Sequence, residues 1–268
     1  MIGSVETTVP FSQQLQNDYQ RSLASSITVT TTTDELDGNT SSFDLLMMNP
    51  GTDGEISLRE AVIAADTQPG TDTINLMSDI YSLTLTGNDQ FGDLDIKSEI
   101  IINGTGSTTI SALNLGERIF EIDNGGSLSL NDLTLQDNFS KGSGGAINNS
   151  GDLETNNVVL RNFDVINTSG GAIYNAGTAD LTLTTIELSE SNNGGAIYNA
   201  SGATLSIYSS TLKDNTASFN GGAIINEGML TVLDTSIIDN DANSGGGIHN
   251  EGNAVSYTHL TLPTIYSV

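Results

Sequence analysis

The sequence predicts an all-β fold, a right-handed parallel β-helix with about three short strands in each coil. Two observations predict it: a motif that returns every 24 to 27 residues, and apolar residues that alternate with polar ones inside each repeat. A third is a short amphipathic pattern before the repeats. A helix there would cover the open end of the first coil, where unpaired backbone would otherwise meet water.

The repeat is marked by a glycine pair in five segments, GGAINN, GGAIYN, GGAIYN, GGAIIN and GGGIHN. Their first glycines lie 26, 24, 27 and 24 residues apart, at Gly144, Gly170, Gly194, Gly221 and Gly245. Within a repeat, Leu205 and Ile207 alternate with polar residues, as in a strand with one buried face. Three short strands cannot bury a core alone, so the coils must stack. A β-propeller or a β-sandwich is the alternative, but these folds usually need longer units or irregular spacing.

Stacked coils place equivalent residues in columns, and successive residues of one column lie about 4.8 Å apart. One column is expected to be aliphatic and to point inward: Ile147, Ile173, Ile197, Ile224 and Ile248. Another is expected at a turn, with side-chain amides bonded to one another and to backbone: Asn149, Asn175, Asn199, Asn226 and Asn250. An apolar residue also precedes an asparagine by three positions in several repeats. The pairs are Leu135 with Asn138, Val159 with Asn162, Leu212 with Asn215 and Ile237 with Asn240, and Leu188 with Ser191 breaks the pattern.

The residue after each inward isoleucine should point outward, because neighbours on a strand alternate. This predicts an exposed binding column made of Asn148, Tyr174, Tyr198, Ile225 and His249. Its two adjacent tyrosines would offer aromatic faces to sugar rings or to an extended segment of a partner. The alternative is that the column only supports strand pairing.

A helix is expected at about residues 58–66, in the segment SLREAVIAAD. Ser57 and Glu60 have the spacing of a capping box, in which each side chain accepts from the other residue's backbone N–H. Pro69 and Gly70 follow and end the helix. Four apolar residues share one face: Leu58, Ala61, Val62 and Ala65.

This segment, followed by DTINL at 72–76, resembles the N-terminal segment of bacterial surface proteins whose signature is Cys-Ser-Leu-Arg-Glu-Ala. Ile56 stands where that cysteine would be. The GGAI-x-N repeats resemble those of right-handed parallel β-helix proteins, including polymorphic outer-membrane proteins and other adhesin-like passengers. The resemblance covers about residues 27–255. It implies a secreted or cell-surface location, and most such proteins have no assigned biochemical activity.

The rest of the chain is less regular. Strands are expected at 93–96, 100–103 and 118–122, and the β-helix with its cap is assigned to 26–256. Residues 1–25 do not read as a secretory signal, since they lack a basic start and an apolar segment, and are expected to be loosely ordered. The last stretch departs from the repeat and resembles a peptide translated from sequencing adapter, so 257–268 is expected to be a non-native tail.

The formal net charge of −26 argues against binding to nucleic acid or to anionic membrane surfaces. It fits solubility in salty water or the binding of divalent cations. The chain has no cysteine, which excludes disulfides and thiolate metal sites. No run approaches the ~18 apolar residues of a membrane span, so no direct membrane insertion is expected.

The β-helix also occurs in pectin-lyase-like enzymes, so an enzymatic function requires the catalytic patterns of that fold. A lyase acting on uronates needs a basic residue to take a proton and aspartates to hold calcium. No tight acidic cluster accompanies Arg161 or Lys213 in the sequence, and His249 lacks a basic partner. The hydrolase pattern of paired aspartates, Gly-His-Gly and Arg-x-Lys is absent. No catalytic residue is therefore assigned.

Calcium is the only candidate cofactor. Asp34, Asp37 and Gly38 resemble part of a calcium loop, but the downstream glutamate and the regular spacing are missing. Asp93 and Asp95 lie on one side of an expected strand. All four acids are interpreted as solvated acids in turns, so no metal site is assigned.

Two classes of function remain. The first is a non-catalytic extracellular passenger, a stiff acidic rod that acts as a spacer or as an adhesin toward a host or cell-surface glycan or protein. The alternative is a fragment of a polysaccharide lyase or hydrolase. A basic cluster beside acids on one face would favour the enzyme.

Overall fold

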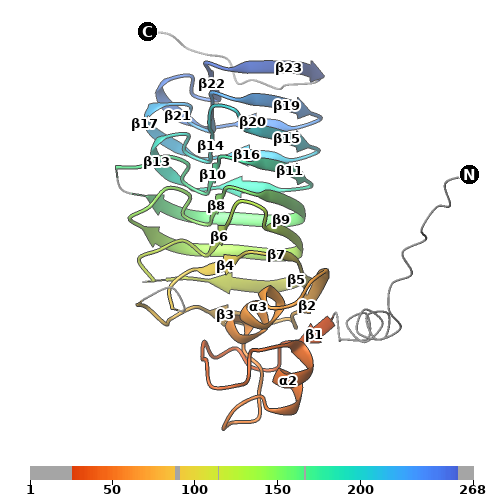
Figure 1. Cartoon of the computed structure of the whole chain (residues 1–268). Coiled ribbons are helices and arrows are strands. Elements are labelled where there is room, and N and C mark those ends of the chain that lie inside the picture. Colours follow the sequence, from red (N-terminus) through yellow and green to blue (C-terminus); the bar gives the residue numbers. More distant parts are fainter. Residues whose placement is uncertain (1–25, 88–90, 114, 166, 259–268) are drawn as a thin grey trace, which may run out of the picture.

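The structure is a computed structural model that describes residues 26–87, 91–113, 115–165 and 167–258. It shows a parallel β-solenoid whose coils stack along one axis, with two helices at the N-terminal end (Figure 1). The predicted fold class is confirmed. The expectations for residues 1–25 and 259–268 lie outside the described residues.

One side of the solenoid is a sheet of seven short strands, one from each coil. Every neighbouring pair is parallel, and each inward isoleucine faces its equivalent in the next coil. The first four of these isoleucines are fully buried, and Ile248 in the last coil is partly buried. The strands are β4 (Leu94–Ile96), β6 (Phe120–Ile122), β8 (Ile147–Asn149), β10 (Ile173–Asn175), β14 (Ile197–Asn199), β18 (Ile224–Asn226) and β22 (Ile248–Asn250).

The other sides form one bent sheet of sixteen strands. Its main path runs through β1 (Ser26–Thr28), β2 (Thr71–Asn75), β5 (Glu99–Ser111), β7 (Ser127–Ser140), β9 (Asp152–Val165), β11 (Thr178–Thr182), β15 (Thr204–Tyr208), β19 (Met229–Leu233) and β23 (Asn253–Thr258). Shorter strands continue it around the coil: β3 (Ile80–Ser82), β12 (Thr185–Glu187), β13 (Glu190–Asn193), β16 (Thr211–Lys213), β17 (Thr216–Asn220), β20 (Ser236–Ile238) and β21 (Asp241–Ser244). A complete later coil thus holds four strand segments, one more than expected.

Two corners bend this sheet in each of the five coils from β7 onward, and one residue at each corner has a positive φ. The first corner is formed by Asp132, Asn157, Leu183, Ser209 and Asp234, and the second by Asp137, Asn162, Leu188, Asp214 and Asp239. Such backbone suits Asn and Asp better than leucine. Because each bend needs only one residue, β7 and β9 pass through both corners as continuous strands.

The corners correct the three-residue spacing inferred from the sequence. Leu160, not Val159, is the inward residue of its coil, and it pairs with Ile186, not Leu188. Phe163 is in register with Asn138, and Ser189 and Asn240 lie in the coils on either side of Asn215. The spacing failed because Asn162 and Leu188 are the outward corner residues of their coils. Counting back from Asn162 therefore reaches Val159 in place of Leu160, and counting back from Ser191 reaches the corner residue Leu188 itself.

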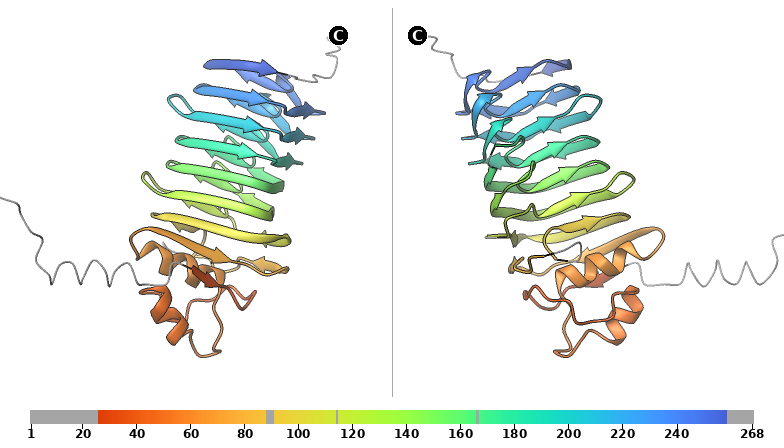
Figure 2. Two further views of the ribbon diagram at one scale, coloured as in Figure 1. Left: turned by 90° about the vertical axis from the view of Figure 1, so that its right-hand side faces the viewer. Right: turned by 60° about the vertical axis from the view of Figure 1, so that its left-hand side comes forward.

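The N-terminal end is covered by helices α2 (Phe43–Met48) and α3 (Leu58–Asp66) (Figure 2). Helix α3 occupies the residues expected for it, and both hydrogen bonds of its capping box are present between Ser57 and Glu60. It packs against β2, β4 and β5 through an apolar face that is almost fully buried: Leu58, Ala61, Val62 and Ala65.

At the other end, β23 pairs with β19 as far as Thr258. The pairing shifts by one residue between Val255 and Tyr257, which is where the sequence leaves the repeat pattern. The first two residues of the expected non-native tail, 257 and 258, are therefore part of a paired strand.

Candidate functional site

The outward residues of the seven-stranded sheet form one continuous column. The strand register aligns them in the order Asp95, Glu121, Asn148, Tyr174, Tyr198, Ile225 and His249. The last five are the expected binding column. The first two belong to coils without the glycine pair, and for this reason the repeat motif did not reveal them.

Tyr174 and Tyr198 stack on one another, with ring centroids 5.1 Å apart and planes 9° from parallel. Both are half-buried, and the Tyr198 hydroxyl donates to the carboxylate of Glu227. Burial, followed by this carboxylate, raises the pKa of Tyr198. Because the two rings stack, each ring has one face covered by the other ring, which removes these two inner faces from contact with a sugar.

The expected exposure of the column is wrong at Ile225, which is only 4% exposed. It lies between Tyr198 and His249 in the register, so a neighbour in the column flanks it on each side. His249 is held by two contacts, one with Ser244 Oγ (3.2 Å from Nδ1) and one with Glu251 (3.0 Å from Nε2). The side chains of this column are thus packed and hydrogen-bonded to one another or to neighbouring residues, which favours a structural role over an open binding face.

The five asparagines form a ladder that joins five coils. Each side-chain Nδ2 donates to Oδ1 of the asparagine in the next coil, at 2.7, 2.8, 2.6 and 2.6 Å. All five also donate to backbone carbonyls. The acceptors are the carbonyls of Thr178, Thr204 and Met229 for the first three asparagines, and those of Gly228 and Gly252 for the last two. All but Asn250 are fully buried, so these amides satisfy backbone groups that no strand pairs.

The polar residues of the SLREA segment hold the cap together. Glu60 accepts from the backbone N–H groups of Asp37, Gly38 and Ser57. Arg59 Nε donates to Asp34 Oδ1 at 2.7 Å, and Nη2 donates to the Gly92 carbonyl at 2.8 Å. Both charged side chains of that pair are 1% exposed. Ser57, Arg59 and Glu60 therefore have structural roles.

Asp34 also accepts from the N–H groups of Thr84 and Leu85, both 2.7 Å away. Its expected place among solvated turn acids is wrong, because it is buried and paired with Arg59. Its oxygens are occupied by these donors, which also removes it from any calcium loop formed with Asp37 and Gly38.

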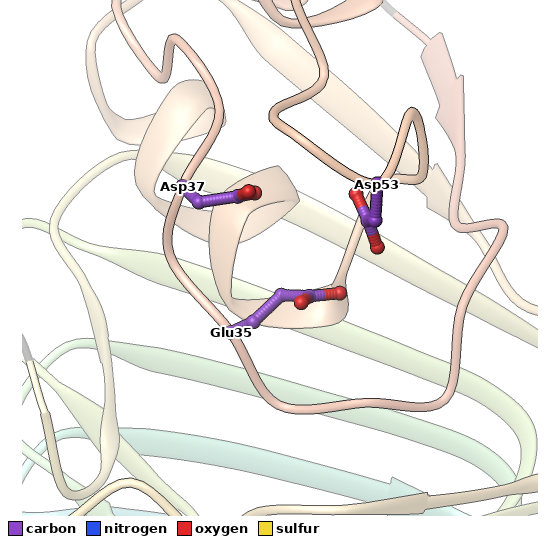
Figure 3. A group of neighbouring side chains, drawn as sticks. All are labelled: Glu35, Asp37 and Asp53. Atoms are coloured by element: carbon purple, nitrogen blue, oxygen red, sulfur yellow. The ribbon is translucent and has the colours of Figure 1, made fainter.

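A different group of acids gathers beside the cap. Carboxylate oxygens of Glu35, Asp37 and Asp53 lie within 4.8 Å of one another (Figure 3). Burial and then Asp53 raise the pKa of Glu35 to about 7, whereas hydrogen bonds from Thr52 lower that of Asp37. Three oxygens at this spacing have the ligand type that Ca²⁺ prefers. The sequence singled out only Asp37, because Asp53 lies on a separate loop.

A cleft of about 600 Å³ lies on the flank of the first coils. Its wall includes Phe91, Asp93, Asp95, Glu117, Arg118 and Lys141. Arg118 Nη1 contacts Asp93 Oδ2 at 3.2 Å and also contacts the carboxylate of Glu121. Burial raises the pKa of Asp93, and Arg118 opposes the shift. Cations and carboxylates thus meet in one concave site, although Asp93 and Asp95 read as solvated turn acids in the sequence.

A smaller recess of about 290 Å³ lies behind it, between α3 and β4. Asp66 lines it and accepts from the backbone N–H groups of Lys97 and Ser98. Burial raises the pKa of Asp66. The lining of this recess is used to hold the cap to the first coil.

No family model, curated protein or solved structure matches the chain in comparisons with known proteins. Within the described ranges, none of the helices is both long and apolar enough to span a membrane.

Proposed function

We propose that this chain is a non-catalytic part of a secreted or cell-surface protein, in which the solenoid acts as a stiff spacer and as an adhesin. The observation that supports this most is the continuity of the columns. The asparagine ladder runs through five coils, and the inward isoleucines beside it are in register with no shift. Buried bonds from coil to coil resist bending, since each coil contacts only its neighbours.

The resemblance of the SLREA segment and the GGAI-x-N repeats to bacterial surface proteins supports the extracellular location. The charge of −26 supports it too, because an acidic surface keeps an exposed rod soluble and off anionic membranes. The expected partner is a glycan or a protein at a host or cell surface.

Adhesion is tested by coating beads with the chain and counting beads retained on host or bacterial cells, with albumin-coated beads as the control. Retention above the control supports the adhesin. If chain-coated and albumin-coated beads are retained equally on every cell type tested, only the spacer role of the proposal remains.

The second candidate is a polysaccharide lyase or hydrolase, and the cleft favours it, since Asp93 and Glu117 there lie beside Arg118 and Lys141. Incubation with polygalacturonate, followed by ultraviolet absorbance and reducing-end assays, separates the two candidates. Product formation that follows protein concentration would establish an enzyme and contradict the non-catalytic proposal.

A further inference from the structure

The cleft lies where the glycine pair of the repeat is missing. Phe120 is in register with Ile147, so Glu117 and Arg118 occupy the positions of Gly144 and Gly145. In the later coils a Cβ on Gly145 would come within 2.5 Å of the Gly171 carbonyl. A side chain at that position of the later coils would therefore collide with the next turn, whereas the side chains of Glu117 and Arg118 line the cleft.

Arg118 is fixed in the cleft wall by Asp93 and Glu121, which both contact its Nη1. Its Nε is buried and has no hydrogen-bond partner among the described residues, so the guanidinium brings its positive charge to the cleft while Nε stays out of reach of a ligand. Gly142 makes room for the guanidinium, since a Cβ there would lie 2.6 Å from Nη2. The exposed Lys141 is the next cation along the wall.

Acceptors lie opposite these donors. Asp93 and Asp95 project from the segment around β4, and Asp95 also contacts Lys97 at 2.8 Å. Glu117 is exposed at the rim. The half-buried ring of Phe91 supplies an apolar wall beside them.

This mixture of charges selects the chemistry of the ligand. A polyanion would meet three carboxylates in the cleft and a chain of net charge −26. A metal cation or a cationic peptide would meet Arg118 and Lys141. A neutral molecule rich in hydroxyl groups fits both signs, because each hydroxyl donates to a carboxylate and accepts from a guanidinium or an ammonium. An aromatic wall suits the C–H face of a sugar ring.

We infer that the cleft around Asp93, Glu117 and Arg118 is a binding site for a neutral saccharide. The inference rests on the adhesive half of the proposed function and gives it a ligand class. It also moves the binding site away from the stacked tyrosines, whose inner ring faces cover one another.

The test is calorimetric titration and saturation-transfer NMR of the full chain with neutral oligosaccharides of glucose, mannose, xylose and N-acetylglucosamine. Trigalacturonate serves as the acidic counterpart. At least one neutral oligosaccharide should bind with a dissociation constant of millimolar or below, and more tightly than trigalacturonate. Phe91→Ala and Lys141→Ala should each weaken this binding about tenfold or more, equivalent to about 1.4 kcal/mol.

Lys213→Ala is the matched control, because Lys213 contacts Glu187 on another face and lies outside the cleft. It should leave the affinity unchanged. Melting curves check that each variant is folded, and Phe91→Leu replaces Phe91→Ala if that variant unfolds. The inference is overturned if no neutral oligosaccharide binds, if trigalacturonate binds more tightly, or if the cleft variants bind as the wild type does.

The outcomes also separate this inference from the proposed function. Retention on cells without saccharide binding would keep the adhesin and discard the cleft as its site. Cleavage of a bound neutral oligosaccharide would support the site and contradict the non-catalytic role.

Discussion

The side chain of Asn175 bridges two coils: its Nδ2 donates to Asn199 Oδ1 at 2.8 Å and to the Thr204 carbonyl at 3.0 Å. It also accepts from Asn149 Nδ2 at 2.7 Å. One buried amide thus connects three consecutive coils. The alignment of the coils depends on such side chains as well as on strand pairing.

Asn175→Ala should lower the local unfolding free energy of the coils around it by about 1–3 kcal/mol, because buried partners lose their hydrogen bonds. Hydrogen exchange of residues 173–204 measures this locally, which suits a solenoid whose coils open separately. Asn243→Ala, at an exposed asparagine bonded to the Ser218 carbonyl, is the control and should change stability by less than about 0.5 kcal/mol. Equal effects of both variants would contradict a structural role for the ladder.

Arg59→Met should destabilise the cap by about 3–5 kcal/mol, because Asp34 would remain buried without its cation. The measurement is the denaturant midpoint of the cap, followed by hydrogen exchange of residues 34–66. Lys97→Met removes an exposed ion pair with Asp95 and should cost less than about 1 kcal/mol. A cap that tolerates both substitutions equally would show that the buried pair is dispensable.

The cap should be less stable at alkaline pH. The pKa of Glu35 is about 7 in the folded chain against an ordinary 4.5, so the folded state holds this proton more tightly. The resulting stabilisation is complete below about pH 4.5 and is lost as the pH rises through 7. Hydrogen exchange in the cap, corrected for intrinsic rates, should therefore be faster at about pH 8 than at about pH 5.

Asp72 should also make the folded chain less stable as the pH rises, but over a lower pH range than Glu35. It is 3% exposed, and burial followed by Asp66 raises its pKa from 3.8 to about 6. Its contribution is lost as the pH rises from about 4 to about 6. Glu35→Gln should remove the upper part of the pH dependence and Asp72→Asn the lower part. An unchanged pH profile in both variants would show that other groups cause it.

The tyrosine pair should contribute to stability. In a double-mutant cycle of Tyr174→Ser and Tyr198→Ser, the coupling energy is expected to be about 0.5–1.5 kcal/mol, as for other stacked aromatic pairs. Retention of beads on cells is measured for the same variants. Lost adhesion without any coupling would make the tyrosines a binding face and contradict the covering of their ring faces.

Leu188→Asn should stabilise the protein. Leu188 has a φ of 55° and is 53% exposed, at a corner where the other coils have Asp or Asn. Asparagine adopts this backbone at lower cost, so a gain of about 0.5–1 kcal/mol in unfolding free energy is expected. Thr185→Asn, in the strand beside the corner, is the control and should give no gain. A loss of stability for Leu188→Asn would show that the leucine makes contacts worth more than its backbone strain.

The sequence alone determined the features that repeat or that are local. The glycine pairs predicted the coils, and the inward isoleucines and the asparagine column followed from the same register. The capping box of Ser57 and Glu60 located α3, since a helix cap depends on residues three positions apart. Such features leave a signal in every copy or within one helical turn.

Only the tertiary structure decided what lies between coils and around the corners. One positive-φ residue at each corner changes which side chain faces inward, so counting made Val159 the equivalent of Leu135, whereas Leu160 is the residue in register with it. Ile225 is buried between its neighbours in the column although the alternating pattern places it on the outward face. Asp34 reaches Arg59 across 25 positions, and the cleft joins residues of three coils. These contacts follow from how the coils stack, and a contact between distant positions leaves no periodic trace in one sequence.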